Sequence, residues 1–163
     1  MIVKNNAVHW HNLLPSVHRI EYVRWSSSYS TGIKLIDDQH KDLLLFVNNL
    51  CNDVTVIEVD EHDAYFRLAI GHMVSYIKKH FAAEEQIMVA TQFPGYYSHK
   101  RTHESFILTV VKSVKDYEAG KRMVLNNLIN FLKNWVFAHI AIMDVQYIDH
   151  FKKNAECHSM KPA

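Results

Sequence analysis

Residues 80–103 read HFAAEEQIMVATQFPGYYSHKRTH, and this stretch contains the two spacings that decide the fold. It holds two pairs of potential metal ligands at i, i+4: His80 with Glu84, and His99 with His103. Side chains four residues apart lie on one face of an α-helix. Between the pairs, Phe93-Pro94-Gly95 interrupts the helical pattern. The stretch therefore predicts two helices joined by a short turn, each with polar residues on its apolar stripe.

Outward from this stretch, apolar residues recur every three or four positions in four segments. The predicted helices span about residues 38–54, 61–91, 96–118 and 122–151. Asp37 or Asp38 suits the start of the first helix, and Gly120 ends the third. Short connections make consecutive helices antiparallel neighbours. We expect an all-α, up-down-up-down antiparallel four-helix bundle with an N-terminal arm.

The length of 163 residues favours one domain. We expect residues 1–36 to form an arm that packs aromatic side chains such as Trp10, Trp25 and Tyr29 on the bundle. Residues 37–152 would form the bundle itself. Residues 153–163 are polar, which predicts a flexible tail.

Composition narrows the function classes. Four Gly and three Pro are too few for a loop-rich all-β fold. Eighteen Lys and Arg against 17 Asp and Glu give a net charge of +1, so we expect no nucleic-acid or anionic membrane partner. We expect no signal peptide, no membrane span and no disulfide framework, and hence a cytoplasmic protein.

The predicted apolar stripes carry seven potential metal ligands. In addition to the two pairs above, His40 lies on the first helix, and His139 and Asp144 lie on the fourth. A single histidine on such a stripe is usually a hydrogen-bonded core residue, but seven on four helices are hard to bury without a metal. Five imidazoles and two carboxylates suit two ions, with Glu84 and Asp144 as bridges and the histidines as terminal ligands.

The spacing from His139 to Asp144 does not fit a regular α-helix. Five residues place their side chains roughly 140° apart at 3.6 residues per turn. Both can reach one centre only if the helix is locally widened. We therefore predict a π-bulge near residues 139–144.

The motifs together resemble the bacteriohemerythrins of the hemerythrin family, over about Trp25 to Phe151. The matching stretches are Gly32-Ile33 with Ile36-Asp37-Asp38-Gln39-His40-Lys41, His80-Phe81-Ala82-Ala83-Glu84-Glu85 with Met88, His99 with His103, and Trp135-Val136-Phe137-Ala138-His139-Ile140 with Asp144 and Tyr147. The HxxxE, HxxxH and HxxxxD spacings in this order, after the lone histidine of the first helix, form a specific combination.

The resemblance implies a non-haem di-iron centre (Fe2+/Fe3+, with an oxo or hydroxo bridge) that binds dioxygen reversibly. It implies that His99, His103 and His139 bind one saturated iron. By the same resemblance, His40 and His80 bind the other iron, which keeps an open position, and Glu84 and Asp144 bridge the two. We expect an apolar oxygen pocket beside the ligands, walled by Leu44, Phe81, Trp135 and Val136.

The remaining histidines have plainer interpretations. We expect His72 to be structural, since it lies roughly 12 Å from His80 along the helix, and His150 to lie outside the site. Glu85 points away from the face of Glu84, which favours a solvated role or a contact with a ligand. The other five are expected at the surface: His9, His11, His18, His62 and His158.

Several functions stay open at this stage. An oxygen carrier, store or delivery module comes first, and a non-enzymatic role is expected. The alternatives are an oxygen or redox sensor acting through a protein partner, a di-iron enzyme acting on peroxide or nitric oxide, and a structural bundle that binds zinc or no metal. The N-terminal arm could hold a protein partner or a second copy of the chain. The chain contains no Glu-x-x-His, which the ferritin-like di-iron enzymes require.

Overall fold

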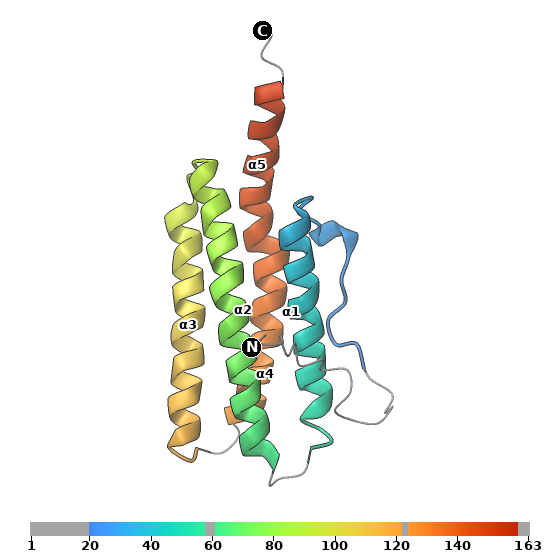
Figure 1. Ribbon diagram of the computed structural model, residues 1–163, viewed down its shortest axis with the longest axis vertical. Helices are drawn as coiled ribbons and strands as arrows, with labels where there is room; N and C mark the ends of the chain where they lie inside the picture. The colour runs from blue at the N-terminus through green and yellow to red at the C-terminus, as the bar shows by residue number, and fades with distance from the viewer. Residues whose placement is uncertain (1–19, 58–60, 122–123, 160–163) are drawn as a thin grey trace, which may run out of the picture.

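The computed structural model describes residues 20–57, 61–121 and 124–159. In chain order the elements are a short 3-10 helix η2 (Ser27–Tyr29), α1 (Lys34–Asp53), α2 (His62–Ala90), α3 (Tyr96–Glu118), α4 (Val124–Ala138), the π-helical segment η4 (His139–Met143) and α5 (Asp144–Ser159). Figure 1 shows that α4, η4 and α5 run as one continuous column beside α1, α2 and α3.

The helices pack in the order in which the chain makes them. Helix α1 contacts α2 and α4, and α3 contacts the same two helices from the opposite side. Helices α1, α2 and α3 and the α4–η4–α5 column run in alternating directions (Figure 1), so neighbours are antiparallel. This arrangement confirms the predicted all-α, up-down-up-down bundle.

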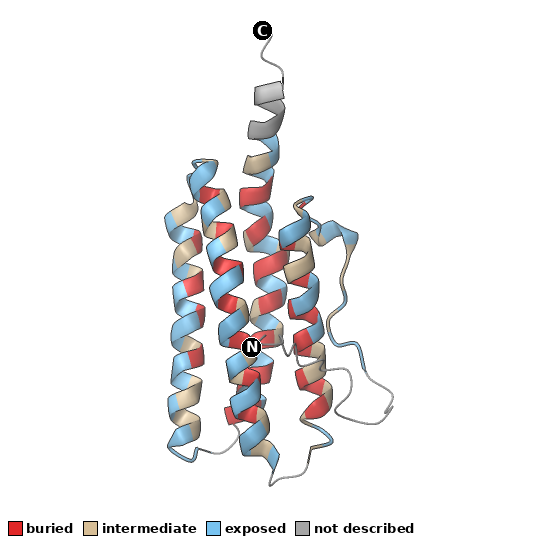
Figure 2. Cartoon of the chain, viewed as in Figure 1, coloured by how far each residue is buried: buried red, intermediate tan, exposed pale blue. Residues whose placement is uncertain are grey.

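Each helix buries one stripe toward the bundle axis, as the red bands of Figure 2 show. The larger apolar cluster joins residues of all four columns, including Val47, Met73, Phe106 and Leu132. A smaller cluster of Met88, Tyr147 and Ile148 lies further along the bundle. On α2 the sequence runs from Phe81 in the first cluster, through Glu84, to Met88 in the second. A polar layer therefore separates the two apolar clusters.

The first helix begins earlier than the periodicity predicted. It starts at Lys34, because Gly32 at φ 77° turns the chain and the Thr31 hydroxyl accepts a hydrogen bond from the Ile33 amide. Asp37 lies in the first turn, as expected for an acid at this end, but its carboxylate is not the helix cap. It accepts hydrogen bonds from the Ser30 hydroxyl and from both the amide and hydroxyl of Thr31. The bundle thus begins at residue 34 rather than 37.

The described part of the N-terminal arm, residues 20–33, packs on the bundle as predicted. The amide groups of Asn48 and Asn52 on α1 pair with the backbone of Ile20 and Val23. The Trp25 and Tyr29 side chains lie against the large apolar cluster. Trp10 and the other residues before Ile20 lie outside the described residues.

The last helix ends later than predicted. It was expected to end near Phe151, but α5 continues to Ser159, so residues 153–159 of the expected tail are helical, and residues 160–163 lie outside the described residues. The segment from Asp144 to Ser159 contains neither Gly nor Pro, so none of its residues interrupts the helix.

Within the described residues, one helical stretch, Val124–Lys153, is long and apolar enough in composition to span a membrane. Several of its apolar side chains are buried. Leu125, Leu128 and Leu132 pack in the bundle core, and the same column carries the buried His139 and Asp144. Core packing therefore accounts for part of its apolar character, and Phe137 and Ile142 of the same stretch are exposed.

Candidate metal centre

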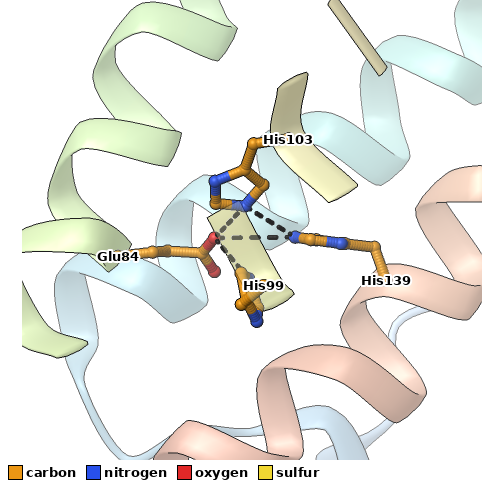
Figure 3. A group of neighbouring side chains, drawn as sticks. All are labelled: Glu84, His99, His103 and His139. Carbon is orange, nitrogen blue, oxygen red and sulfur yellow. Dashed lines mark hydrogen bonds and ion pairs between the residues drawn. The ribbon is translucent and has the colours of Figure 1, made fainter. Parts of the chain in front are cut away.

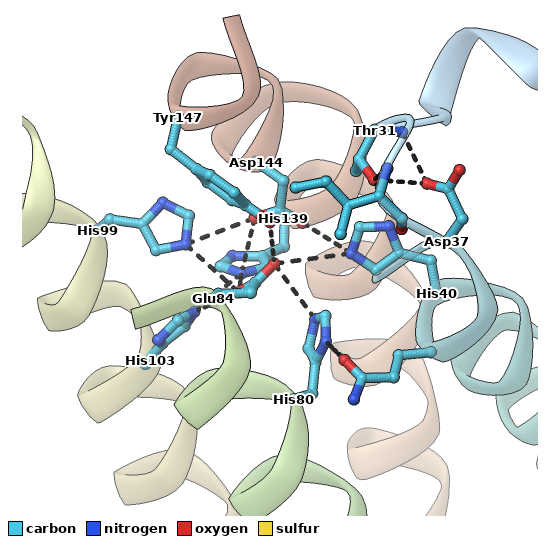
Figure 4. A network of polar contacts seen from close by, with 12 residues as sticks. Thr31, Asp37, His40, His80, Glu84, His99, His103, His139, Asp144 and Tyr147 are labelled. Atoms are coloured by element: carbon cyan, nitrogen blue, oxygen red, sulfur yellow. Dashed lines mark hydrogen bonds and ion pairs between the residues drawn. The ribbon is translucent and has the colours of Figure 1, made fainter. Parts of the chain in front are cut away.

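The polar layer of the bundle brings together all seven predicted ligands. Every one of these side chains is at most 2% exposed. Figure 4 shows them converging from all four columns. Helix α1 supplies His40, α2 supplies His80 and Glu84, α3 supplies His99 and His103, and the α4–η4–α5 column supplies His139 and Asp144.

The seven side chains form two ligand groups that share one carboxylate. The first contains Glu84, His99, His103 and His139, which Figure 3 shows pointing toward one another. The second contains His40, His80, Glu84 and Asp144. Within each group the ligand atoms lie within 4.8 Å of one another. Each group therefore has the size of the first coordination shell of a single metal ion.

Glu84 directs its two oxygens to different groups of histidines. Its Oε2 lies 3.1 Å from His103 Nε2, and also near the Nε2 atoms of His99 (3.7 Å) and His139 (3.6 Å). Its Oε1 lies 3.5 Å from His80 Nε2 and 3.7 Å from His40 Nε2. The two oxygens of one carboxylate thus face two separate imidazole sets, as a bridging ligand must.

Asp144 divides its oxygens in the same way. Its Oδ1 lies 3.2 Å from His139 Nε2 and 3.4 Å from His99 Nε2, whereas its Oδ2 lies 3.2 Å from His40 Nε2. Asp144 therefore reaches the first histidine group as well as its own. Both carboxylates have the arrangement that the sequence predicted for bridges between two ions.

The site also meets a direct test of fit for metal ions. Among the described residues, seven buried atoms of this layer have no hydrogen-bond partner: His40 Nδ1 and Nε2, His80 Nε2, Glu84 Oε2, His99 Nε2, and Asp144 Oδ1 and Oδ2. A buried polar group without a hydrogen bond costs about 1–3 kcal/mol. Metal coordination removes this cost.

The separation of two facing nitrogens supports the same conclusion. His103 Nε2 and His139 Nε2 are 3.1 Å apart. Two nitrogens bound to one ion at about 2.1 Å, at right angles to each other, are separated by about 3.0 Å. The two imidazoles thus already stand as neighbouring ligands of one ion.

The predicted π-bulge is confirmed. Residues His139–Met143 form the π-helical segment η4, between α-helical φ and ψ angles at Ala138 and Asp144. The additional residue in this turn brings His139 and Asp144 to the same side of the column, where both are buried. On a regular α-helix the two side chains would point in different directions.

When no ion is bound, burial and the neighbouring charges shift the pKa values of these groups in different directions. Burial lowers the pKa of His80 to about 3 and that of His139 to about 4. Burial also acts to lower the pKa of His40, but the Asp144 and Glu84 carboxylates outweigh it and raise the pKa to about 9. Burial and the charge of Glu84 raise the pKa of Asp144 well above its usual value. Neutral imidazoles are the form that binds metals.

Three further side chains form hydrogen bonds with the ligand residues. Gln39 Oε1 lies 3.0 Å from His80 Nδ1, and Glu85 Oε1 lies 3.2 Å from His103 Nδ1. The Tyr147 hydroxyl donates to Glu84 Oε1 at 3.1 Å. The expected contact of Glu85 with a ligand is therefore present. Residue spacing did not indicate the roles of Gln39 and Tyr147, although both lie in the stretches that carry the resemblance.

The four residues expected to wall an oxygen pocket lie in or against the large apolar cluster. Phe81 stacks on His103 with ring centroids 3.7 Å apart, and Trp135 stacks on His139 at 4.1 Å. These two rings therefore contact the three-histidine group, while Phe81 also lies 5.9 Å from the His80 ring. Leu44 and Val136 are buried. Their role as the wall of an oxygen pocket stays a prediction.

The other histidines of the described region lie outside the two ligand groups. His72 packs on Phe46 and lines a surface groove of about 300 Å³ between α1 and α2. His150 donates from Nε2 to the Thr91 carbonyl at 2.8 Å. Both predictions are confirmed. His62, expected at the surface, is half-buried, and the side chains of His9, His11, His18 and His158 lie outside the described part of the chain.

Comparison with known proteins agrees with the geometry. The profile of the hemerythrin HHE cation binding domain matches residues 31–159. A bacteriohemerythrin of Pseudomonas aeruginosa (strain LESB58) is 34% identical over 125 residues, which cover 77% of this chain and 78% of the relative. A bacteriohemerythrin of Stenotrophomonas maltophilia (strain R551-3) is 32% identical over 128 residues, covering 78% and 80%. A hemerythrin-like protein of Naegleria gruberi is 29% identical over 125 residues, covering 76% and 88%.

Proposed function

The chain belongs to the hemerythrin family, and from this premise we propose that it binds dioxygen reversibly at a non-haem di-iron centre, as an oxygen carrier, store or delivery protein. The observation that carries the proposal is the division of the Glu84 and Asp144 oxygens between two histidine groups. That arrangement suits two ions joined by two carboxylates, whereas a single ion would use only one of the two histidine groups.

The donor set is compatible with iron. Imidazole nitrogens and carboxylate oxygens suit first-row transition metals of intermediate softness. Family membership makes iron the proposed ion, and a solvent-derived oxo or hydroxo bridge the proposed third link between the two. When bound, such a pair of ions supplies the electrons that reversible dioxygen binding needs.

The two groups differ in their number of histidines, and this difference favours an open position. Three imidazoles, two carboxylate oxygens and one solvent-derived bridge would complete about six positions at the ion held by His99, His103 and His139. The group of His40 and His80 supplies one imidazole fewer. We therefore propose that dioxygen binds on the side of His40 and His80.

The surroundings of the centre favour reversible binding over enzymatic turnover. The Tyr147 hydroxyl is buried against Glu84, and burial together with the Glu84 charge raises its pKa far above the usual value. This hydroxyl therefore keeps its proton, and apolar or aromatic side chains such as Phe81 line the nearby core. A site that delivers few protons does not promote cleavage of bound dioxygen. A non-enzymatic role and a cytoplasmic location stay predictions.

The test is the visible absorption spectrum of the purified protein, with iron counted in the same sample. About two irons per chain, and a colour that appears in air and disappears under vacuum, would support the proposal. Iron without a reversible colour change would favour a sensor or an enzyme. A chain that binds no iron, even when it is reconstituted anaerobically with Fe2+, would overturn the proposal.

A further inference from the structure

Two of the ligand histidines contact side chains of different charge on the far side of their rings. His80 Nδ1 faces the neutral amide oxygen of Gln39 at 3.0 Å. His103 Nδ1 faces the carboxylate of Glu85 at 3.2 Å. Because both partners accept, each Nδ1 carries the proton, and each Nε2 is left with its lone pair toward the ligand cluster.

Both partners are fixed by contacts of their own. The second oxygen of Glu85 accepts from Lys100 Nζ at 3.1 Å, and this ion pair raises the pKa of the Lys100 ammonium. The backbone carbonyl of Gln39 accepts from the Tyr76 hydroxyl at 3.0 Å. Tyr76 also packs against the His80 ring, with centroids 5.1 Å apart. The Glu85 carboxylate is therefore held by both His103 and Lys100, and the backbone of Gln39 is held at the point from which its side chain reaches His80.

The two contacts also tie neighbouring helices together. Gln39 reaches from α1 to His80 on α2, and Glu85 reaches from α2 to His103 on α3. Each histidine belongs to a different ligand group: His80 to that of His40 and Asp144, His103 to that of His99 and His139. The Gln39 contact would therefore affect the ion bound by His80, and the Glu85 contact the ion bound by His103.

The chemical effect of the two partners differs. A carboxylate that accepts the Nδ1–H of an imidazole pulls the proton toward itself, and this makes Nε2 a stronger donor to a metal. A neutral amide orients the ring but adds much less electron density. Hydrogen bonds to ligands are among the factors that set the potential of protein-bound iron, and a stronger donor stabilises the higher oxidation state.

We propose that Glu85 and Gln39 are positioning residues that add an electronic difference between the two ion sites, beyond their different numbers of histidines. Glu85, acting through His103, makes the ion of the three-histidine group the easier one to oxidise. Gln39 orients His80 without adding charge, so the other ion holds its electron more tightly. The part of this inference that concerns oxidation rests on the proposed iron centre, whereas the part that concerns orientation holds for any divalent ion.

The orientation is tested without iron, by titrating chelator-treated protein with Co2+. The wild type should bind two ions. Glu85→Ala should weaken one of the two binding steps about 10–100-fold, and Gln39→Ala should weaken the other step by a similar factor. The double variant should show both losses. Glu104→Gln, an exposed charge removal next to His103, is the matched control and should leave both steps unchanged. Two unchanged steps in both single variants would overturn the orienting role.

The electronic part is tested on iron-loaded protein, by anaerobic titration with a one-electron oxidant. Each step converts one Fe2+ to Fe3+, and the electron passes to the oxidant. Glu85→Gln keeps a hydrogen-bond acceptor but removes the charge, so the first step should shift to a higher potential. Gln39→Glu should shift the second step to a lower potential and narrow the gap between the steps.

The two parts can fail separately. If Glu85→Gln and Gln39→Glu leave the gap between the two steps the same as in Glu104→Gln, the charges do not distinguish the ions and the inference is wrong. If the protein takes up no iron but the Co2+ result is as expected, the proposed di-iron function fails while the orienting role stands.

Discussion

Replacing Glu84 with Gln tests the centre most directly, because this one side chain faces both ligand groups. The amide has nearly the same shape as the carboxylate, so the helix and the core should keep their packing. The substitution removes the negative charge that the two oxygens share, and each of these oxygens faces one histidine group. Oε2 lies 3.1 Å from His103 Nε2 and Oε1 lies 3.5 Å from His80 Nε2. Both ions should therefore bind less tightly.

The magnitude follows from the number of ions affected. Loss of a hydrogen-bonded partner behind a ligand already costs about 10–100-fold in metal affinity, so loss of a charged ligand should cost at least about 100-fold per ion. At about 1.36 kcal/mol per factor of ten, two ions lose about 5 kcal/mol. Metal binding stabilises the folded state, so this loss lowers the melting temperature. For a chain of this length the shift should be about 10–20 °C.

The assay compares thermal unfolding and bound metal for wild type, Glu84→Gln and the exposed control Glu104→Gln, with and without a chelator. The difference between Glu84→Gln and wild type should be large in metal-loaded protein and should largely disappear in the chelator. Glu104→Gln should match the wild type throughout. If Glu84→Gln still binds two ions with wild-type affinity and melts within about 2 °C of wild type, Glu84 does not bridge two ions and the ligand assignment is wrong.

Further predictions concern the surroundings of the centre. Tyr147→Phe removes the hydroxyl that donates to the shared carboxylate, so urea titration should show a loss of about 1–3 kcal/mol; an unchanged midpoint would mean that this bond contributes nothing. Asp37→Ala removes the acceptor for three hydrogen bonds from the arm, and we expect a loss of about 1–2 kcal/mol with faster proteolysis before residue 34; equal proteolysis rates would contradict it. In chelator, burial lowers the folded pKa values of His80 and His139 to about 3 and about 4 from 6.5, so their contribution is complete above about pH 6.5 and is lost as pH falls toward 4. The pKa of His40, raised to about 9, adds stability that is present below about pH 6.5 and lost as pH rises through 9. The three histidines therefore give a maximum of the urea midpoint near pH 6.5. The raised pKa of Asp144 adds stability as pH falls and makes the decline on the acid side shallower, so a midpoint that does not fall at all between pH 6.5 and 3 would contradict the assignments of His80 and His139.

The sequence predicted the bundle because its signals are local. Apolar spacing of three and four residues depends only on the helical repeat, and Phe93-Pro94-Gly95 ends one helix whatever surrounds it. The same repeat placed His80 and Glu84 on one face. It also exposed the misfit between His139 and Asp144 that predicted the π-helical segment, which the structure contains.

Helix ends depended on contacts that periodicity does not record. Asp37 was expected at the start of the first helix, but its carboxylate binds Ser30 and Thr31, and the helix starts at Lys34. The last helix extends to Ser159 because no residue there stops it, although its polarity suggested a loose tail. Helix ends of this kind are set by side-chain contacts and by the residues that follow the helix.

The sequence by itself determined which residue types the bundle buries and on which helices they lie, because the repeat of the α-helix decides which side chains share a buried face. Only the tertiary structure decided how the carboxylates serve two groups at once. The division of the two oxygens of Glu84, and of those of Asp144, between the two histidine groups comes from how the four columns pack together. The contacts of Gln39 with His80 and of Glu85 with His103 also cross between helices. No spacing along one helix can encode such contacts, because they depend on the distance and rotation between packed helices.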